Sequence, residues 1–212
     1  MEIQIWSDVV CPWCYIGKRR LEEALGRFEH RDQVELVWRS FELDPQAPRT
    51  REGSSEEHLA RKYAMSTDQA RAAQNRVSDL AAEHGVTMRF DIAKGGNTFD
   101  AHRLLHLSAE HGLQPQLKER LMAAYFTEGR AIGDPETLRE LAIEIGLPAD
   151  LVREVLATDA YAADVRADQQ LARDYDITGV PFFVIDGKYA VAGAQRTDVL
   201  LDVLEQAWSE KD

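Results

Sequence analysis

Cysteine is scarce in this chain of 212 residues, and its only two cysteines, Cys11 and Cys14, stand in one C-x-x-C motif. No second cysteine pair is present to complete a tetrahedral zinc site, which needs four ligands. A disulfide between the two would close a very short loop, and the entropic stabilisation from a disulfide grows with loop length. The scarcity therefore favours a redox-active dithiol over a zinc site or an inert structural pair.

Basic residues are also in deficit. The chain has 25 Lys and Arg against 37 Asp and Glu, a formal net charge of -12. This balance argues against a nucleic-acid partner, because affinity for the phosphate backbone comes mostly from Lys and Arg contacts.

Long apolar runs are missing as well. No stretch is long and apolar enough to span a bilayer, and no basic stretch followed by an apolar run resembles a secretory signal. We therefore expect no membrane partner and a cytoplasmic location, where a cysteine pair is more often catalytic than structural.

The dithiol lies between a predicted strand and a predicted helix. Residues 2–6 alternate polar and apolar side chains, and residues 15–28 place apolar side chains at helical spacing. Pro12 suits the first position of a helix, which makes Cys11 the N-cap residue. The positive end of the helix dipole then favours a thiolate at Cys11, so we expect Cys11 to be the nucleophile and Cys14 the resolving thiol.

A second alternating stretch, residues 34–41, predicts another strand, so the chain begins as strand, helix, strand. That order is typical of a parallel pair with a right-handed crossover, the first half of a thioredoxin-type fold. Helices are then expected near residues 55–63, 66–84, 99–111, 114–127, 134–144, 149–157 and 159–175. We read this helical block, residues 49–174, as an insertion into a domain formed by residues 1–48 and 175–212.

The carboxyl end predicts two more strands and a helix. Residues 177–191 read as a β-hairpin with an Asp186-Gly187 turn, and Pro181 stands at the entry of its first strand. A final helix is expected from Arg196 or Thr197. Its predicted buried face consists of Val199, Leu200, Val203, Leu204 and Trp208.

Taken together, the C-P-W-C motif, the helical block and the T-G-V-P-F-F stretch of residues 178–183 resemble the DsbA-like thioredoxin-fold superfamily. Residues 7–14, 97–103 and 125–129 are similar to the FrnE-type dithiol oxidoreductases of that superfamily. The resemblance implies an α/β protein with a thioredoxin fold, βαβ…ββα, interrupted by a large all-helical insertion. It also implies a thiol-disulfide oxidoreductase or isomerase with no cofactor beyond its redox-active disulfide and no metal.

The same resemblance implies that the Val180-Pro181 bond is cis and lies against the dithiol. The backbone N–H and C=O of Val180 would then be able to pair with an extended substrate. Pro12, Trp13 and Asn97 are the other substrate-binding candidates. The expected substrates are protein or small-molecule thiols and disulfides, with glutathione as a candidate co-substrate.

Two departures from better-known members of the superfamily affect the chemistry. Ile5 occupies the position, six residues before the nucleophile, where thioredoxin and DsbA have a buried carboxylate, and Asp8 is the nearest carboxylate in sequence. Trp13 replaces the His of DsbA, and an uncharged indole cannot stabilise a thiolate by charge. We therefore expect a disulfide less oxidising than that of DsbA.

An alternative function remains open, because 2-hydroxychromene-2-carboxylate isomerases and kappa-class glutathione transferases have a similar helical insertion and bind glutathione. Those proteins typically carry serine at the position of Cys11. If this chain is instead a glutathione-dependent isomerase or transferase, Asn97 and Gly193-Ala194-Gln195 are the expected glutathione contacts.

The remaining conspicuous residues have simpler interpretations. His102 and His106 are one helical turn apart, but no third ligand stands at a matching spacing, so we expect packing or surface roles. Lys18-Arg19-Arg20 follow the dithiol by one turn and are expected to form a solvated face.

Overall fold

The computed structural model describes residues 1–210 of the chain, which divides into two compact units. The first unit combines Met1–Leu43 with the segment from Asp168 onward, and the second is Asp44–Ala167. The boundaries expected from sequence, after residues 48 and 174, lie a few residues later in both places.

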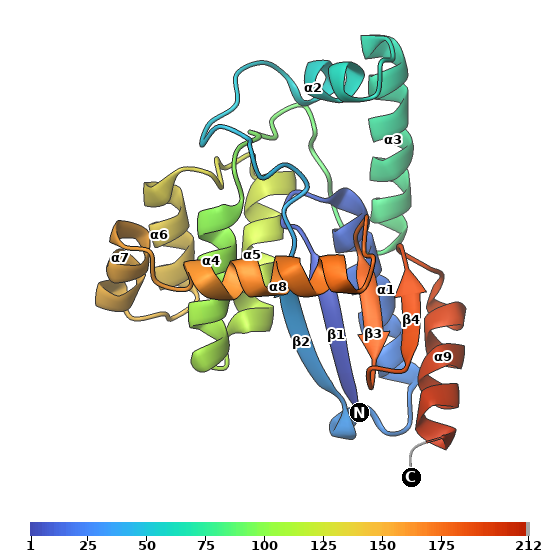
Figure 1. The fold of residues 1–212 in the computed structure, drawn as a ribbon. Coiled ribbons are helices and arrows are strands. Elements are labelled where there is room, and N and C mark those ends of the chain that lie inside the picture. Colours follow the sequence, from blue (N-terminus) through green and yellow to red (C-terminus); the bar gives the residue numbers. More distant parts are fainter. Residues whose placement is uncertain (211–212) are drawn as a thin grey trace. The chain divides into compact units, whose positions relative to one another are not determined.

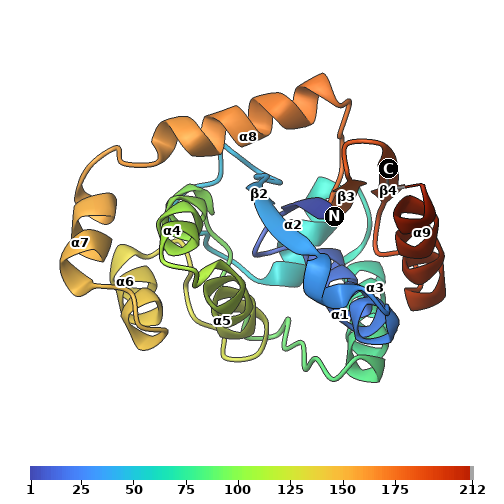
Figure 2. The same ribbon diagram turned by 90° about the horizontal axis from the view of Figure 1, so that it is seen from below.

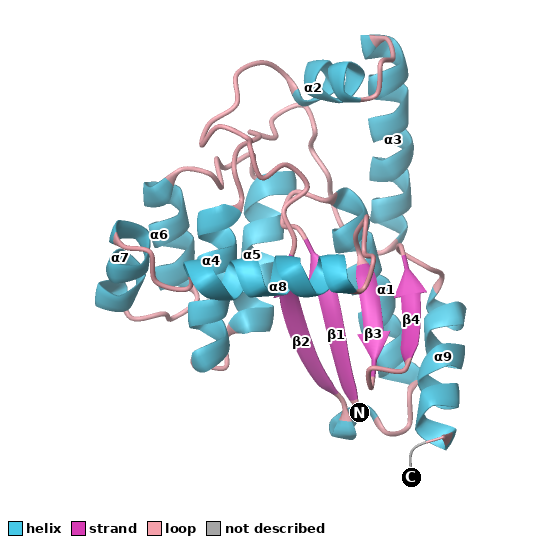
Figure 3. Cartoon of the chain, in the orientation of Figure 1, coloured by secondary structure: helices cyan, strands magenta, loops and turns pink. Residues whose placement is uncertain are grey.

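The first unit is built on a four-stranded sheet with the strand order β2-β1-β3-β4 (Figures 1 and 3). Its strands are β1 (Glu2–Ser7), β2 (Glu35–Ser40), β3 (Phe182–Ile185) and β4 (Tyr189–Ala192). β1 pairs with β2 in parallel, while β3 runs antiparallel to both β1 and β4. The central strand β1 thus lies between a neighbour from the amino end of the chain and one from the carboxyl end.

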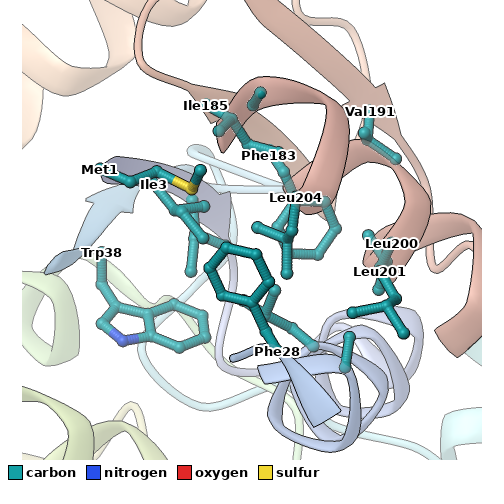
Figure 4. Close-up of a cluster of buried hydrophobic side chains, with 14 residues drawn as sticks. Met1, Ile3, Phe28, Trp38, Phe183, Ile185, Val191, Leu200, Leu201 and Leu204 are labelled. Carbon is teal, nitrogen blue, oxygen red and sulfur yellow. The ribbon is translucent and has the colours of Figure 1, made fainter. Parts of the chain in front are cut away.

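Two helices pack on one face of this sheet. Helix α1 (Pro12–Arg27) and the short 3-10 turn Arg31–Gln33 connect β1 to β2, and α9 (Thr197–Ser209) follows β4. Ile3 of β1 points into the core that these helices cover, together with Phe183 and Leu204 (Figure 4). Ile5 belongs to the same core. Burial of each such side chain contributes about 1.5 to 3 kcal/mol.

The other face of the sheet has a smaller core. Trp6, one step along β1 from Ile5, packs there with Ala172, Ile177 and Val184. Because successive side chains of a strand point to opposite faces, β1 contributes to both cores. Ala172 belongs to the carboxyl-terminal part of α8 (Ala162–Asp174), the helix in which the chain passes back into the first unit.

The hairpin and the start of the last helix agree with the sequence prediction. Asp186 and Gly187, between β3 and β4, both have positive φ (48° and 64°), as a tight hairpin turn with the right-handed twist of the strands requires. Arg196 is the N-cap of α9.

The predicted buried face of α9 was partly wrong. Val199 is 40% exposed, whereas Leu201 and Ala207 are buried beside Leu200 and Leu204. The helix packs along the stripe formed by these four residues, and Val199 lies on the side of the helix turned away from that stripe.

The second unit is helical in its regular structure. It contains α2 (Ser55–Lys62), α3 (Thr67–Glu83), α4 (Phe99–Glu110), α5 (Gln114–Phe126), α6 (Pro135–Glu144) and α7 (Ala149–Ala157). Helices α4 to α7 pack against one another (Figure 2), and α2 and α3 form a separate helical hairpin. Helices α2 and α3 each begin with a capping box, in which Ser54 pairs with Glu57 and Ser66 with Gln69.

Candidate active site

The dithiol lies where β1 ends and α1 begins. Cys11 is the N-cap residue of α1, with an extended backbone (φ -89°, ψ 114°), and Pro12 is the first helical residue. The carbonyl oxygen of Cys11 accepts hydrogen bonds from the backbone N–H groups of Cys14 (3.1 Å) and Tyr15 (3.3 Å). The first turn of the helix therefore holds both cysteines in a fixed relation.

The exposure of the C-P-W-C residues is uneven. Cys11 and Cys14 are free thiols, 4% and 1% exposed, while Trp13 between them is 44% exposed. Cys11 is thus the less shielded of two buried sulfurs, and the indole beside it is open to solvent.

A segment from the other end of the chain completes the site. The Cys11 thiol donates a hydrogen bond to the carbonyl oxygen of Val180 at 3.6 Å, across 169 positions of sequence. The Val180-Pro181 peptide bond that follows is cis. The structure thus brings Cys11 and Val180 together directly before β3, the strand that pairs with β1.

The two positions that we compared with thioredoxin and DsbA have different surroundings. Ile5 is 1% exposed and pairs with Phe183 across the sheet, so an apolar side chain fills this place in the core. Asp8 is completely buried, and its Oδ2 accepts a hydrogen bond from the backbone N–H of Leu43 at 2.8 Å. The Asp8 carboxylate therefore ties the loop before Cys11 to the segment that follows β2.

The basic residues after the dithiol do not form a solvated face, and that expectation was wrong. Lys18 is 5% exposed, with its Nζ 2.6 Å from Glu22. The guanidinium of Arg19 lies 5.2 Å from the centre of the Tyr15 ring, and Arg20 donates to the carbonyl oxygen of Ala194 at 2.7 Å. Each of the three cations has a partner within the first unit.

Asn97 belongs to the helical unit, and its amide is bonded to backbone there. Its Oδ1 accepts from the N–H of Phe99 at 2.9 Å, at the start of α4, and its Nδ2 donates to Pro45 at 3.3 Å. These bonds give Asn97 a role at the helix start. Its role in substrate binding stays a prediction.

The histidine pair lies on α4 in the same unit. His102 is fully buried, and the His106 ring stacks on Tyr161 with their centres 6.5 Å apart. Within residues 1–210, no group of three or more His, Cys, Asp or Glu side chains has an arrangement that could hold a metal ion. Among the same residues, no helix is both long enough and apolar enough to cross a membrane.

From the sequence, Gly17 had no expected role, and Arg20 was expected on a solvated face. Gly17 is buried inside α1 directly against Pro181. A glycine within a helical pattern lowers helix propensity, but the pattern is the same at Gly26, where a Cβ atom would meet nothing within 4 Å, so the sequence does not single out Gly17. No local pattern indicates the bond from Arg20 to Ala194, which crosses 174 positions of sequence.

Comparison with known proteins assigns this chain to a family. The model of the DSBA-like thioredoxin domain matches residues 2–205, nearly the whole chain. The chain belongs to the DsbA-like thioredoxin domain family. The expected fold class is thereby confirmed, and the protein is a thiol-disulfide oxidoreductase of the DsbA-like kind.

Two proteins are similar to this chain over its whole length. A crystal structure of a probable DsbA oxidoreductase from Streptomyces coelicolor is 46% identical, with a TM-score of 0.96, covering 100% of this chain and 92% of the other. The uncharacterized protein YwbO from Bacillus subtilis is 30% identical over 100% of this chain and 99% of its own length.

The fold extends to more distant proteins. The cytosolic disulfide reductase DsbM from Pseudomonas aeruginosa, solved with glutathione, has a TM-score of 0.68 at 18% identity, covering 99% of this chain and 100% of the other. At this identity the likeness concerns the fold alone.

Proposed function

We propose that the chain exchanges disulfides with thiol substrates through Cys11 as the nucleophile and Cys14 as the resolving thiol. The observation that carries this proposal is the position of Cys11. It is the N-cap of α1, three residues before Cys14 in the first turn of the helix, and its thiol donates to the Val180 carbonyl oxygen at 3.6 Å.

The exchange needs two displacements. The Cys11 thiolate attacks one sulfur of a substrate disulfide, the substrate S–S bond breaks, and the departing thiolate takes up a proton. Cys14 then loses its proton and attacks the Cys11 sulfur of the mixed disulfide, which releases the second substrate thiol. The substrate gains two electrons and two protons, and the protein is left with a Cys11–Cys14 disulfide. Oxidation of a substrate dithiol is the same sequence in reverse. In isomerisation a second thiolate of the substrate, instead of Cys14, attacks the substrate sulfur of the mixed disulfide, which forms a new substrate disulfide and releases Cys11 as a thiolate.

We assign substrate contact to the groups around the Cys11 sulfur. The exposed Trp13 offers an apolar surface directly beside the nucleophile. Pro12 follows Cys11 in sequence, and Pro181 follows Val180, whose carbonyl oxygen accepts the Cys11 thiol. Val180 offers its backbone to an extended segment. Such a segment could pair with that backbone as an added strand.

The experiment that tests the roles is a trapping comparison by intact-protein mass spectrometry. Cys14→Ser should accumulate a mixed disulfide with added substrate, because no resolving thiol remains, while Cys11→Ser should accumulate little. Equal accumulation in Cys11→Ser would show that the two cysteines do not have these roles.

We also propose glutathione as a small-molecule thiol partner and the cytoplasm as the compartment, in line with the FrnE-type resemblance of residues 7–14. DsbM, which shares the fold, is described as cytosolic and was solved with glutathione. Isothermal titration with glutathione and alkylation of the dithiol in intact cells test the two parts separately.

The same variants separate a glutathione-dependent isomerase or transferase from a dithiol enzyme. Turnover of a small aromatic electrophile that persists in Cys14→Ser would support the isomerase or transferase. Loss of all activity with Cys14, together with trapped adducts on Cys11, supports the dithiol enzyme.

A further inference from the structure

One side of α1 docks against the junction between β4 and α9. The contacts recur every three to four residues along the helix: Arg20 donates to Ala194, Glu23 accepts from Thr197 at 2.7 Å, and Arg27 pairs with Asp198 at 2.8 Å. This spacing places the three residues on one helical face. Gly17 continues the same face toward the dithiol.

Gly17 is where this face comes closest to the residues around Cys11. A Cβ atom at Gly17 would lie 2.8 Å from Cγ of Pro181 and 3.5 Å from both Ala194 and Phe183. The obstructing atom belongs to a proline ring, which cannot swing aside as the end of a flexible side chain can. Glycine therefore permits α1, with Cys11 at its start, to approach the Pro181 segment.

A chain of hydrogen bonds connects the same face to the Cys11 sulfur. Arg20 holds the carbonyl of Ala194 (2.7 Å), and the N–H of the adjacent Gly193 donates to the carbonyl of Pro181 (2.8 Å). Pro181 follows Val180, whose carbonyl accepts the Cys11 thiol. From one face of α1, Gly17 thus leaves room for Pro181, and Arg20 holds Ala194, whose neighbour Gly193 is bonded to Pro181.

We propose that Gly17 and Arg20 are positioning residues that set the separation between the Cys11 sulfur and the Val180-Pro181 segment. The inference rests on the proposed function, since it assigns these two residues to the handling of extended disulfide substrates. A substrate that pairs with the Val180 backbone while its sulfur reaches Cys11 needs both groups at the right distance. A small disulfide needs only the sulfur.

The same separation affects the dithiol-disulfide equilibrium. The Cys11 sulfur can donate to the Val180 oxygen only as a protonated thiol of the reduced protein, so the contact stabilises the thiol form of the reduced state. If the segment moves away, the equilibrium with glutathione should shift toward the protein disulfide by about two- to five-fold, the effect of one modest hydrogen bond.

Two glycines of α1 provide a matched pair of variants. Gly26 lies in the same helix but is exposed, and a Cβ atom there would meet nothing within 4 Å. Alanine improves helix propensity equally at both sites, so only the contact with Pro181 distinguishes them. Gly17→Ala should raise KM for a peptide disulfide about three- to ten-fold and leave KM for 2-hydroxyethyl disulfide within about two-fold. Gly26→Ala should change neither.

A second series of variants tests Arg20. If Gly17→Ala does not fold, this series by itself tests the proposal. Arg20→Met should raise KM for the peptide disulfide and shift the glutathione equilibrium in the same direction as Gly17→Ala. Arg20→Lys, which keeps a donor for the Ala194 carbonyl, should restore most of both. Arg27→Met removes an exposed ion pair of the same face and should leave both quantities unchanged.

The inference is overturned if Gly17→Ala behaves like Gly26→Ala, or if Arg20→Met lowers the melting temperature without changing KM or the equilibrium. It is also overturned if Gly17→Ala raises KM for the peptide disulfide and KM for 2-hydroxyethyl disulfide by the same factor. These outcomes differ from a failure of the proposed function, in which wild-type exchange and Cys11 trapping are themselves absent.

Discussion

The surroundings of the Cys11 sulfur are formed by its neighbours in sequence and by one segment that is distant in sequence. The N-cap position and Pro12 could be predicted, because strand and helix patterns on either side of the motif fix where the helix begins. The contact with Val180 was expected only from the family resemblance, since it joins residues 169 positions apart. Local patterns carry no information about a pairing of that kind.

Lys18 shows the opposite case, in which a local reading was misleading. Three consecutive basic residues on an exposed helix usually face solvent, and the sequence gives no sign of what covers Lys18. The structure buries this side chain to 5% exposure and pairs it with Glu22. A buried lysine is rare unless it is paired, so its burial depends on tertiary packing that no helical pattern reports.

Asp168 provides a test of stability at the residue scale. Its carboxylate is 4% exposed and accepts from the N–H of Ser40 (2.8 Å) and from Arg39 (3.1 Å), where α8 meets β2. Asp168→Ala should lower the free energy of unfolding by about 2 to 4 kcal/mol, because it leaves a buried N–H and a half-buried guanidinium without their acceptor. Chemical denaturation measures the loss.

Two further variants make that measurement specific. Asp168→Asn keeps an acceptor for Ser40 and should lose less than Asp168→Ala. Asp198→Ala breaks an ion pair whose side chains are 54% and 56% exposed, so solvent screening should make its effect much smaller. Similar losses in Asp198→Ala and Asp168→Ala would contradict the account of the buried pair.

At the scale of elements, helix starts were predicted better than helix faces. The starts expected near residues 55, 66 and 134 lie within one residue of the starts of α2, α3 and α6, because the N-caps Ser54, Ser66 and Asp134 are local signals. Val199 was placed on the wrong face because several apolar stripes fit α9, and only packing against α1 and the sheet selects one. Helix ends depend on local chemistry, whereas buried faces depend on distant partners.

The cap of α6 gives a pH-dependent prediction. Asp134 accepts hydrogen bonds from the N–H and the hydroxyl of Thr137, both at 2.9 Å, and these bonds lower the pKa of the Asp134 carboxyl below its usual 3.8. Because the folded-state pKa is the lower one, the contribution is fully present above the unfolded-state pKa and is lost as the pH falls through the folded-state pKa.

Asp134→Ala should therefore cost about 1 kcal/mol at neutral pH, and this difference from wild type should shrink as the pH falls below 3.8. Urea denaturation of both proteins at neutral and acidic pH measures it. Asp134→Asn keeps a capping oxygen that does not titrate, so its stability difference from Asp134→Ala should stay constant. A cost of Asp134→Ala that grows toward acidic pH would have the wrong sign for this account.

At the scale of the molecule, the order of strands and helices explains how the site is assembled. The first unit takes its amino-terminal strands and helix from one end of the chain and its hairpin and last helix from the other. β1 pairs with β3, so the segment entering β3 must lie beside the loop leaving β1. The alternating patterns and the Asp186-Gly187 turn predicted these elements, and the family resemblance supplied their arrangement.

Three contacts between distant residues of the first unit could not be predicted from the sequence. Gly17 against Pro181, Arg20 to Ala194 and Asp168 to Ser40 each join distant parts of the chain. Each depends on side-chain distances that follow only after the sheet and helices have packed. The sequence predicts the elements and the chemical groups, and the packed structure determines the spacing between them.

The most direct test of the central claim is a redox titration of the wild-type protein. The protein is equilibrated in glutathione buffers of graded potential, quenched with acid and alkylated. Intact-protein mass spectrometry then counts the alkylated cysteines. The account predicts one reversible two-electron transition between a doubly alkylated dithiol and a Cys11–Cys14 disulfide that resists alkylation. Its midpoint should be more negative than the about -120 mV of DsbA. Two alkylated cysteines at every potential, or only glutathione adducts with no internal disulfide, would contradict it.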